Sequence, residues 1–220
     1  MSRGSHNSAL HSRDGRSVSA GAPAQRRELR AQGRKTMRRL ADAGLRVFAE
    51  RGYHESRVDD IVRAARTSHG TFYLYFANKE DLLRSLAMDC AHEVEALAEG
   101  LGPIGAGSDG EAALREFLAG FLATYRRYGV VIRAWMEDQV SDREVDRLGV
   151  RAFTRIATAL GSRMEQATPG SDNPATVAAL MALLERSCYA VTSRALDLDD
   201  DTTVSSLAVL VHRGFFGAAA

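Results

Sequence analysis

The chain has 220 residues, 45% hydrophobic and 26% charged, which are ordinary values for globular proteins and exclude a wholly disordered or collagen-like chain. Two cysteines are too few for a disulfide scaffold, and no apolar run reaches the roughly 18 residues of a membrane span. We therefore expect a cytoplasmic protein with no membrane partner. The net charge is only +1, but residues 1–40 hold ten basic and two acidic residues, whereas the other 180 hold 19 basic and 26 acidic ones.

The basic N-terminal end favours an anionic partner, and nucleic acid is the first candidate. The alternative is a basic tail that is simply solvated. Residues 1–30 mix Ser, Gly, Arg and Ala without a hydrophobic period. They are therefore predicted to form a disordered basic tail.

From about residue 31 onward the sequence predicts helices only, because alternating β-branched runs and hairpin signals are absent. Polar caps followed three positions later by an acidic residue mark several helix starts. These caps are Ser56, Asn78, Ser108 and Ser141, and Asn173 precedes Pro174 as a cap does. The helices are predicted at 34–51, 57–65, 68–75, 79–101, 111–128, 130–140, 142–167, 174–195 and 201–216. The predicted fold class is all-α.

Residues 40–83 contain two short predicted helices joined by a tight turn. Val58 and Ile61 give the first of them an inward face, and the second begins at Ser68 after the turn at Arg66 and Thr67. The longer helix that precedes them braces the pair. Two short helices arranged in this way are typical of a helix-turn-helix.

At these positions the chain resembles the TetR family of bacterial transcriptional regulators. The matching residues are Ala43, Phe48, Gly52, Tyr53, Val58, Ile61, Ala65, Ser68, Gly70, Thr71, Tyr73, Tyr75, Phe76, Lys79, Glu80, Leu82 and Leu83. The resemblance covers about a fifth of the chain. It implies a helix-turn-helix DNA-binding domain at 31–79 and a helical effector-binding and dimerisation domain at 80–220.

The start of the second short helix suits DNA on physical grounds as well. Short side chains there admit the helix end to a major groove about 12 Å wide, and free backbone N–H groups suit a phosphate. The resemblance implies that Thr71, Tyr73, Tyr75 and Lys79 touch the DNA backbone and that Thr67, His69 and their neighbours reach bases. The candidate DNA-binding residues are Arg57, Arg66, Thr67, Ser68, His69, Gly70, Thr71, Tyr73, Tyr75 and Lys79. The alternative for the aromatic residues is core packing, which we favour for Phe76 and not for Tyr73.

Two features depart from the family pattern. The family usually has Gly in the turn where this chain has Arg66, so either the turn differs or Arg66 is left-handed at a cost of about 1 kcal/mol. Arg66 would also be placed for an added phosphate contact. The basic N-terminal extension is long, and along the minor groove or backbone it would add salt-dependent affinity without sequence choice.

The helix predicted at 111–128 has a wide, aromatic-rich face. Ordinary core packing is the plain interpretation, but the resemblance implies a ligand cavity among the central helices. The candidate ligand-binding residues are Phe117, Phe121, Tyr125, Trp135, Met136 and Tyr189. The few charges among them favour a small hydrophobic or aromatic effector.

The last two predicted helices are apolar around much of their circumference, and the resemblance implies a homodimer through them and a pseudo-palindromic operator. The sequence thus predicts a repressor released from double-stranded operator DNA by an effector. The alternative is a ligand-independent or partner-regulated DNA-binding protein. An enzyme is not expected, because no catalytic constellation is visible, and no metal or other cofactor is expected. Gly105–Gly110 matches G-x-G-x-x-G, but it follows a helix and is read as an interhelical loop.

Overall fold

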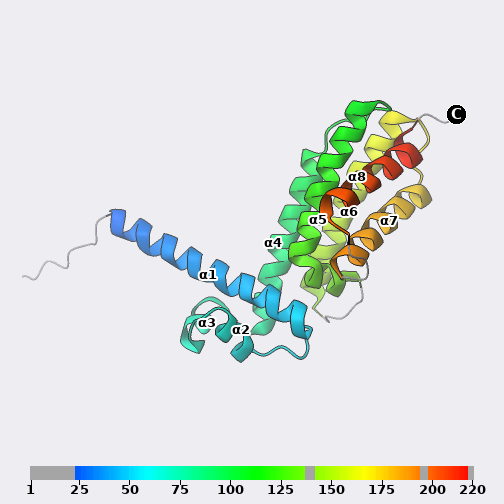
Figure 1. Ribbon diagram of the computed structural model, residues 1–220. Helices are drawn as coiled ribbons and strands as arrows, with labels where there is room; N and C mark the ends of the chain where they lie inside the picture. The colour runs from blue at the N-terminus through cyan, green and yellow to red at the C-terminus, as the bar shows by residue number, and fades with distance from the viewer. Residues whose placement is uncertain (1–22, 137–141, 194–197, 218–220) are drawn as a thin grey trace, which may run out of the picture. The chain divides into compact units, whose positions relative to one another are not determined.

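The computed structural model describes residues 23–136, 142–193 and 198–217, with side chains from residue 31 onward except that of Met136. These residues are helical throughout their regular structure and contain no β-strand, which confirms the all-α fold class. The helices are α1 (Pro23–Arg51), α2 (Val58–Ala64), α3 (His69–Tyr75), α4 (Lys79–Gly100), α5 (Ser108–Met136), α6 (Arg143–Ala167), α7 (Pro174–Thr192) and α8 (Asp200–Val211), followed by a π-helical turn, His212–Phe216 (Figure 1).

The described residues divide into two units, one that ends at residue 36 and one that begins at residue 37. The second unit contains α2 to α8 and the C-terminal half of α1. It includes nearly all of both domains predicted from the sequence, and the predicted boundary between residues 79 and 80 falls at the first turn of α4. That division into domains stays a prediction.

Helix α1 begins earlier than the sequence analysis expected. Residues 23–30, which were assigned to the disordered tail, are helical, so this part of the prediction is wrong. The segment lacks a hydrophobic period, but Pro23 suits the first turn of a helix and the following Ala, Gln, Arg, Glu and Leu are strong helix formers. Residues 1–22 of the predicted tail lie outside the described residues.

Side-chain caps fix several helix starts as predicted. Ser68 Oγ accepts the Thr71 N–H at 3.1 Å, Asn78 Oδ1 accepts the Asp81 N–H at 2.8 Å, and Asn173 Oδ1 accepts the Thr176 N–H at 3.0 Å ahead of Pro174. Each such cap contributes about 1 kcal/mol, because it satisfies a backbone donor that the helix itself leaves free.

Other predicted caps are wrong. Ser56 is buried, and its hydroxyl donates to the Gly52 carbonyl at 2.6 Å, so the N-cap of α2 is Arg57 instead. Asp60 then accepts the Arg57 N–H at 3.2 Å. Ser108 is already inside α5, and α6 is capped by Asp142, whose side chain accepts the Glu144 N–H at 2.9 Å. Each error is a shift of one residue, which is the ordinary uncertainty of helix ends.

Two predicted helices, 111–128 and 130–140, are one helix with a kink. Tyr128 has φ −110° and ψ 16°, outside helical values, and α5 continues beyond it to Met136. Gly129 follows the kink, where its lack of a side chain weakens helix preference. The last predicted helix, 201–216, is observed as α8 followed by the π-helical turn.

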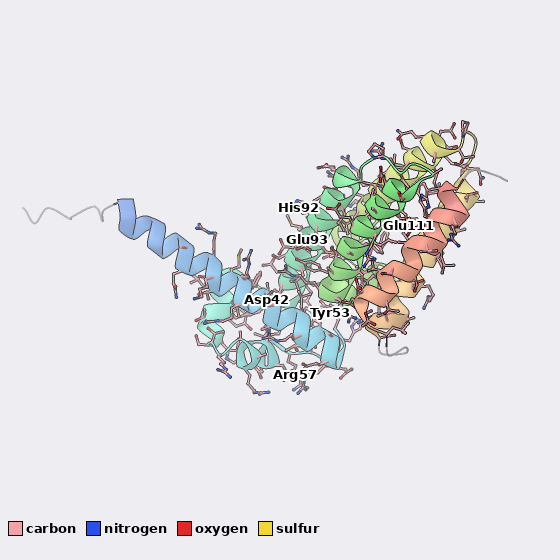
Figure 2. The ribbon with its side chains drawn as sticks, turned by 45° about the horizontal axis from the view of Figure 1, so that its top comes forward. Asp42, Tyr53, Arg57, His92, Glu93 and Glu111 are labelled. Carbon is pink, nitrogen blue, oxygen red and sulfur yellow. The ribbon has the colours of Figure 1, made fainter. Side chains whose placement is uncertain are left out.

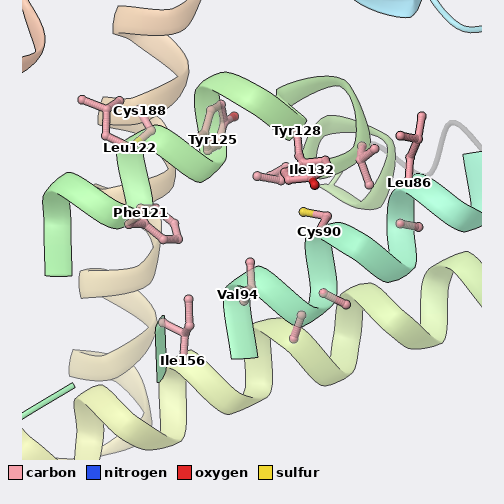
Figure 3. Close-up of a cluster of buried hydrophobic side chains, with 14 of the residues drawn as sticks. Leu86, Cys90, Val94, Phe121, Leu122, Tyr125, Tyr128, Ile132, Ile156 and Cys188 are labelled. Atoms are coloured by element: carbon pink, nitrogen blue, oxygen red, sulfur yellow. The ribbon is translucent and has the colours of Figure 1, made fainter. Parts of the chain in front are cut away.

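The hydrophobic core runs through both ends of the 37–220 unit. Helix α4 packs on α5 and α6, and α5 packs on α7 and α8. Figure 3 shows Tyr128 and Ile132 of α5 near Cys90 of α4, and Cys188 of α7 beside Leu122 of α5. Both cysteines are buried, and burial raises the pKa of the Cys188 thiol to about 12. A thiol with so high a pKa is a poor nucleophile near neutral pH.

Glycine permits a close approach between α1 and α4. A Cβ on Gly44 would lie 2.7 Å from Leu82 Cδ2, closer than two carbon atoms pack. Leu82 lies in the first turn of α4, so α1 rests directly on the start of that helix. The arrangement couples the position of α1 to that of α4.

Candidate nucleic-acid interface and ligand pocket

The short helices α2 and α3 are held by a few buried side chains. Ile61 of α2 and Phe72 of α3 are fully buried, and Phe76, just past α3, is nearly so. The prediction that Phe76 belongs to the core is therefore confirmed. With these residues turned inward, the opposite side of α3 is left to solvent.

The turn between α2 and α3 has the left-handed residue that the sequence raised as one of two options. Arg66 has φ +51°, a value that no other non-glycine residue has among those described. The next residue, Thr67, donates its N–H to the Val62 carbonyl at 3.0 Å and closes the turn. Arg66 thus accepts a strain of about 1 kcal/mol and remains exposed.

The exposed side of α3 carries polar and aromatic side chains together. Tyr73 is 57% exposed and Leu74 is 75% exposed, although both belong to a helix with a buried opposite side. Of the predicted DNA-binding residues, Arg57, Arg66, Ser68, His69, Gly70 and Tyr73 are exposed, and Thr67, Thr71, Tyr75 and Lys79 are partly buried. Eight of the ten residues lie on α3 or in the turn before it, whereas Arg57 caps α2 and Lys79 begins α4.

Leu74 was missed by the sequence analysis. An isolated leucine in a short helix normally belongs to a core, as Phe72 does. The periodicity of α3 does separate them, because residues two apart on a helix point to different sides.

His69 is held by a carboxylate of the preceding helix. Its Nε2 lies 2.5 Å from Asp59 Oδ1, and both side chains are more than half exposed. The contact orients the imidazole, so that its Nδ1 is the ring atom left to contact another group. The sequence gave no sign of this pair, because the two residues lie on different helices.

Lys79 is engaged inside the protein. Its Nζ donates to the carbonyls of Tyr53 at 2.9 Å, His54 at 3.3 Å and Ser56 at 3.0 Å, and it lies 4.5 Å from the centre of the Tyr53 ring. An ammonium has three protons, so all of them have acceptors here. In this conformation Lys79 fixes the loop before α2. To contact a phosphate, as predicted, it would have to give up one of these carbonyl acceptors.

Helix α1 also carries basic side chains. Arg34, Lys35, Arg38 and Arg39 are all exposed. Figure 2 places Arg57 near the loop that precedes α2. Exposed cations of this kind attract an anionic polymer in a salt-dependent manner.

The predicted ligand-binding residues are placed in two groups. Phe117 and Phe121 are buried on α5 with their rings stacked 6.1 Å apart, and Trp135 packs edge-on against Phe153. None of these three lines the pocket between α1, α5 and α7 that is described below. Met136 ends α5, and its side chain is outside the described part. Phe117, Phe121 and Trp135 are therefore packed as the plain interpretation has it, and their ligand contact remains a prediction.

The other two residues, Tyr125 and Tyr189, meet at a pocket of about 500 Å³ between the C-terminal end of α1, the kinked part of α5 and α7. Tyr125 is fully buried, and its hydroxyl donates to Glu185 Oε1 of α7 at 3.0 Å. Burial, reinforced by Glu185, raises the pKa of Tyr125. The pair joins the kinked helix α5 to α7.

An ionic link also joins α1, α4 and α5. Arg127 of α5 lies 3.6 Å from Asp42 of α1 and 3.3 Å from Glu93 of α4, and the Tyr128 hydroxyl donates to Glu93 at 3.1 Å. Figure 2 labels Asp42 and Glu93 on their helices. The link begins at the α5 kink and reaches the helix that braces α2 and α3.

Residues 40–86 match the family model described as bacterial regulatory proteins, tetR family. Among curated proteins, the chain is 49% identical over 55 residues to a fatty acid metabolism regulator protein of Bacillus subtilis. That alignment covers 25% of this chain and 28% of the relative, so the chain is matched to little more than a quarter of the relative's length.

Solved structures share the fold over most of the chain. A bacterial regulatory protein in the tetR family from Rhodococcus RHA1 superposes with a TM-score of 0.64 and 18% identity, covering 84% of this chain and 99% of that one. The transcriptional regulator FadR from Bacillus subtilis, solved in complex with stearoyl-CoA, superposes with a TM-score of 0.55 and 21% identity, covering 83% and 98%. At these identities the likeness establishes the fold.

Proposed function

Because the chain belongs to the tetR family of bacterial regulatory proteins by residues 40–86 and has the fold of that family's solved members, we propose that it is a DNA-binding transcriptional regulator. The observation that supports this most directly is α3. Its inner side chains are buried, and Tyr73 and His69 are exposed on its other side beside cationic Arg57 and Arg66. The exposed side chain of Tyr73 is free to contact a phosphate or a base of DNA.

A second copy of the chain is the expected partner of α7 and α8. Helix α7 is long and apolar enough to span a membrane by composition, yet only 22% of its apolar window is buried. Glu185 and Arg186 lie in the middle of the helix, and placing charged side chains at the centre of a bilayer costs much free energy. Leu183 and Leu210 are exposed on α7 and α8. A symmetric four-helix contact with a second copy would cover this surface and pair two α3 helices for an inverted-repeat operator.

The dimer is tested by light scattering after gel filtration. Leu210→Glu should convert a dimer to a monomer, because a buried unpaired carboxylate opposes association. Val150→Glu is the matched control, since Val150 is an exposed residue of α6, outside α7 and α8, and this variant should stay dimeric. A wild-type chain that is monomeric at every concentration would refute the dimer.

Regulation by an effector is the finer part of the proposal. The FadR similar in fold was solved with stearoyl-CoA, and a curated relative regulates fatty acid metabolism, which supports a hydrophobic effector for this chain. A bound effector would favour a conformer with α4 displaced, and α1 would follow because Gly44 rests on Leu82. A coupling of about 1–3 kcal/mol gives a fivefold to hundredfold fall in operator affinity, that is, repression relieved by ligand.

The operator is found by selecting duplexes from a random pool with the purified protein. The proposal predicts an inverted repeat with half-sites about one helical turn apart. No enrichment over the input pool would refute sequence-specific binding. If the selected duplex is not released by stearoyl-CoA or by the acids named in the next subsection, the ligand-independent or partner-regulated alternative is favoured.

A further inference from the structure

The pocket between α1, α5 and α7 combines polar and apolar walls. Its volume is about 500 Å³, ample for a small organic molecule. The residues that matter for its chemistry are Leu45 and Glu50 of α1, Val130 and Arg133 of α5, and Tyr189 and Thr192 of α7. Three arginines of α5, Arg126, Arg127 and Arg133, line it.

Only one of these arginines is free to bind a ligand. Arg126 makes a two-pronged ion pair with Asp200, and Arg127 is shared between Asp42 and Glu93. Arg133 is half-buried and has no hydrogen-bond or ion-pair partner among the described residues. A guanidinium has five N–H donors in a planar fork, and partial burial without an acceptor is costly.

The backbone is shaped to hold Arg133 over the pocket. Its Nη1 lies 3.4 Å from the point where a Cβ on Gly129 would be, so the guanidinium folds back along α5 over that glycine. Tyr125, one turn further back, also lines the pocket, and the positive charge of Arg133 acts to lower its pKa against the effect of burial. The free cation therefore faces the pocket and not the solvent beyond α5.

The other walls of the pocket determine which ligand would fit beside Arg133. Leu45, Val130 and the Tyr189 ring supply apolar surface, while Glu50 is an exposed carboxylate at the α1 side. A second negative charge on the ligand would be repelled by Glu50. We propose that this pocket binds an amphipathic monocarboxylic acid, with its carboxylate on Arg133 and its apolar body against α1 and Tyr189.

Such a ligand would act on the DNA-binding region directly, an inference that rests on the proposed function and names its effector class. Leu45 and Glu50 belong to α1, the helix whose Phe48 is buried in the core beneath α2 and α3. Filling the space between α1 and α5 changes the equilibrium position of α1 only if the ligand binds one position better than the other. The Asp42–Arg127–Glu93 link alongside is the contact that such a shift would strain.

A second arginine-lined groove provides an internal control. It lies between α4 and α6 and has a volume of about 470 Å³. Its Arg155 likewise has no hydrogen-bond or ion-pair partner among the described residues, but it is exposed, and water satisfies its donors. Arg151 and Arg163 there are occupied by Glu95 and by the Leu101 carbonyl. The groove has no aromatic wall, so it is not expected to hold the apolar part of the same ligand.

The test is calorimetric titration of the full-length protein with decanoate and 4-phenylbutyrate, each beside its neutral alcohol, decanol or 4-phenylbutanol. At least one acid should bind saturably and about tenfold or more tighter than its alcohol, since a guanidinium–carboxylate pair supplies charge-assisted hydrogen bonds. Arg133→Gln should weaken that acid by a similar factor, Arg133→Lys should restore part of it, and Arg155→Gln should leave it unchanged.

Equal binding of acid and alcohol would overturn the proposal, as would an Arg133→Gln variant that binds like wild type or a loss seen only in Arg155→Gln. Failure of both acids to bind the wild type would overturn it as well. Operator binding by each variant is measured in parallel and shows that the variant is folded. If the wild type binds its operator but no acid, only this pocket's role is refuted. If the wild type selects no operator, the proposed regulator itself is refuted.

Discussion

The DNA-binding region and the C-terminal helices are constrained to different degrees. Helices α2 and α3 have seven residues each, and nearly every side chain is either in a small core, as Phe72 is, or on the outer surface that DNA would meet, as Tyr73 is. Helices α4 to α7 have 19 to 29 residues and bury one long apolar side, which many sequences provide. Residues 40–86 therefore contain a recognisable sequence motif, whereas the C-terminal helices are recognised only by their hydrophobic periodicity.

The largest predicted effect is in the small core. Phe72→Ala should lower the free energy of unfolding by about 3–5 kcal/mol, because seven-residue helices have few side chains that can fill the cavity. Chemical denaturation followed by circular dichroism measures it. Leu74→Ala, two residues on but exposed, should change stability by less than about 0.5 kcal/mol. Similar losses of stability in both variants would contradict the division of α3 into a buried side and an exposed side.

Substitution of Lys79 tests whether this residue has a structural role or contacts DNA. Lys79→Met should lower the free energy of unfolding by about 1–3 kcal/mol, since three carbonyls lose a charged donor. Arg57→Met, at an exposed cation, should leave stability unchanged and weaken DNA binding. If Lys79→Met instead keeps its melting temperature and reduces the salt dependence of DNA binding by about one unit, Lys79 is a phosphate ligand.

Arg66 tests the turn with a smaller effect. Arg66→Gly should stabilise the protein by up to about 1 kcal/mol, because glycine adopts φ +51° without strain. Ala64→Gly, two residues earlier and helical, should destabilise it by about 0.5–1 kcal/mol. Thermal melts of the two variants should therefore shift in opposite directions, and a shift in the same direction would count against strain at Arg66.

A further prediction concerns stability at alkaline pH. Burial, followed by the charge of Glu80, raises the pKa of Tyr53 from 10.0 to about 12. A folded pKa above the unfolded one favours the neutral phenol in the folded protein, so this contribution is complete below about pH 10 and disappears as the pH rises through about 12. Tyr53→Phe should accordingly lose less stability than wild type across that interval, and equal losses would contradict the assignment.

The sequence predicted the features that depend on residues close together in the chain. The caps at Ser68, Asn78 and Asn173, the left-handed option at Arg66 and the burial of Phe76 all follow from local chemistry, and the structure confirms them. Ser56 failed because α2 begins one residue later than expected, with Arg57 as its N-cap, and Ser56 is buried with its hydroxyl donating to the Gly52 carbonyl.

Features assembled from distant segments were not predictable. Lys79 finds its acceptors more than 20 residues earlier, and the pocket around Arg133 needs α1, α5 and α7 at once. The aromatic face of α5 was correctly placed inside the protein, but periodicity does not tell a packed ring from one that lines a cavity. Tyr125 and Tyr189 of the predicted set line the pocket between α1, α5 and α7, because the kinked part of α5 brings Tyr125 opposite α7.

The most direct test of the central claim is binding of the purified protein to the DNA that flanks its own gene, by mobility shift across a salt series, with Tyr73→Ala beside the wild type. The account predicts saturable, competitor-resistant binding that Tyr73→Ala weakens about tenfold or more without a change in melting temperature, since Tyr73 is exposed. Weak, salt-labile binding that is the same in both proteins would contradict it and would leave only the basic N-terminal end in contact with DNA.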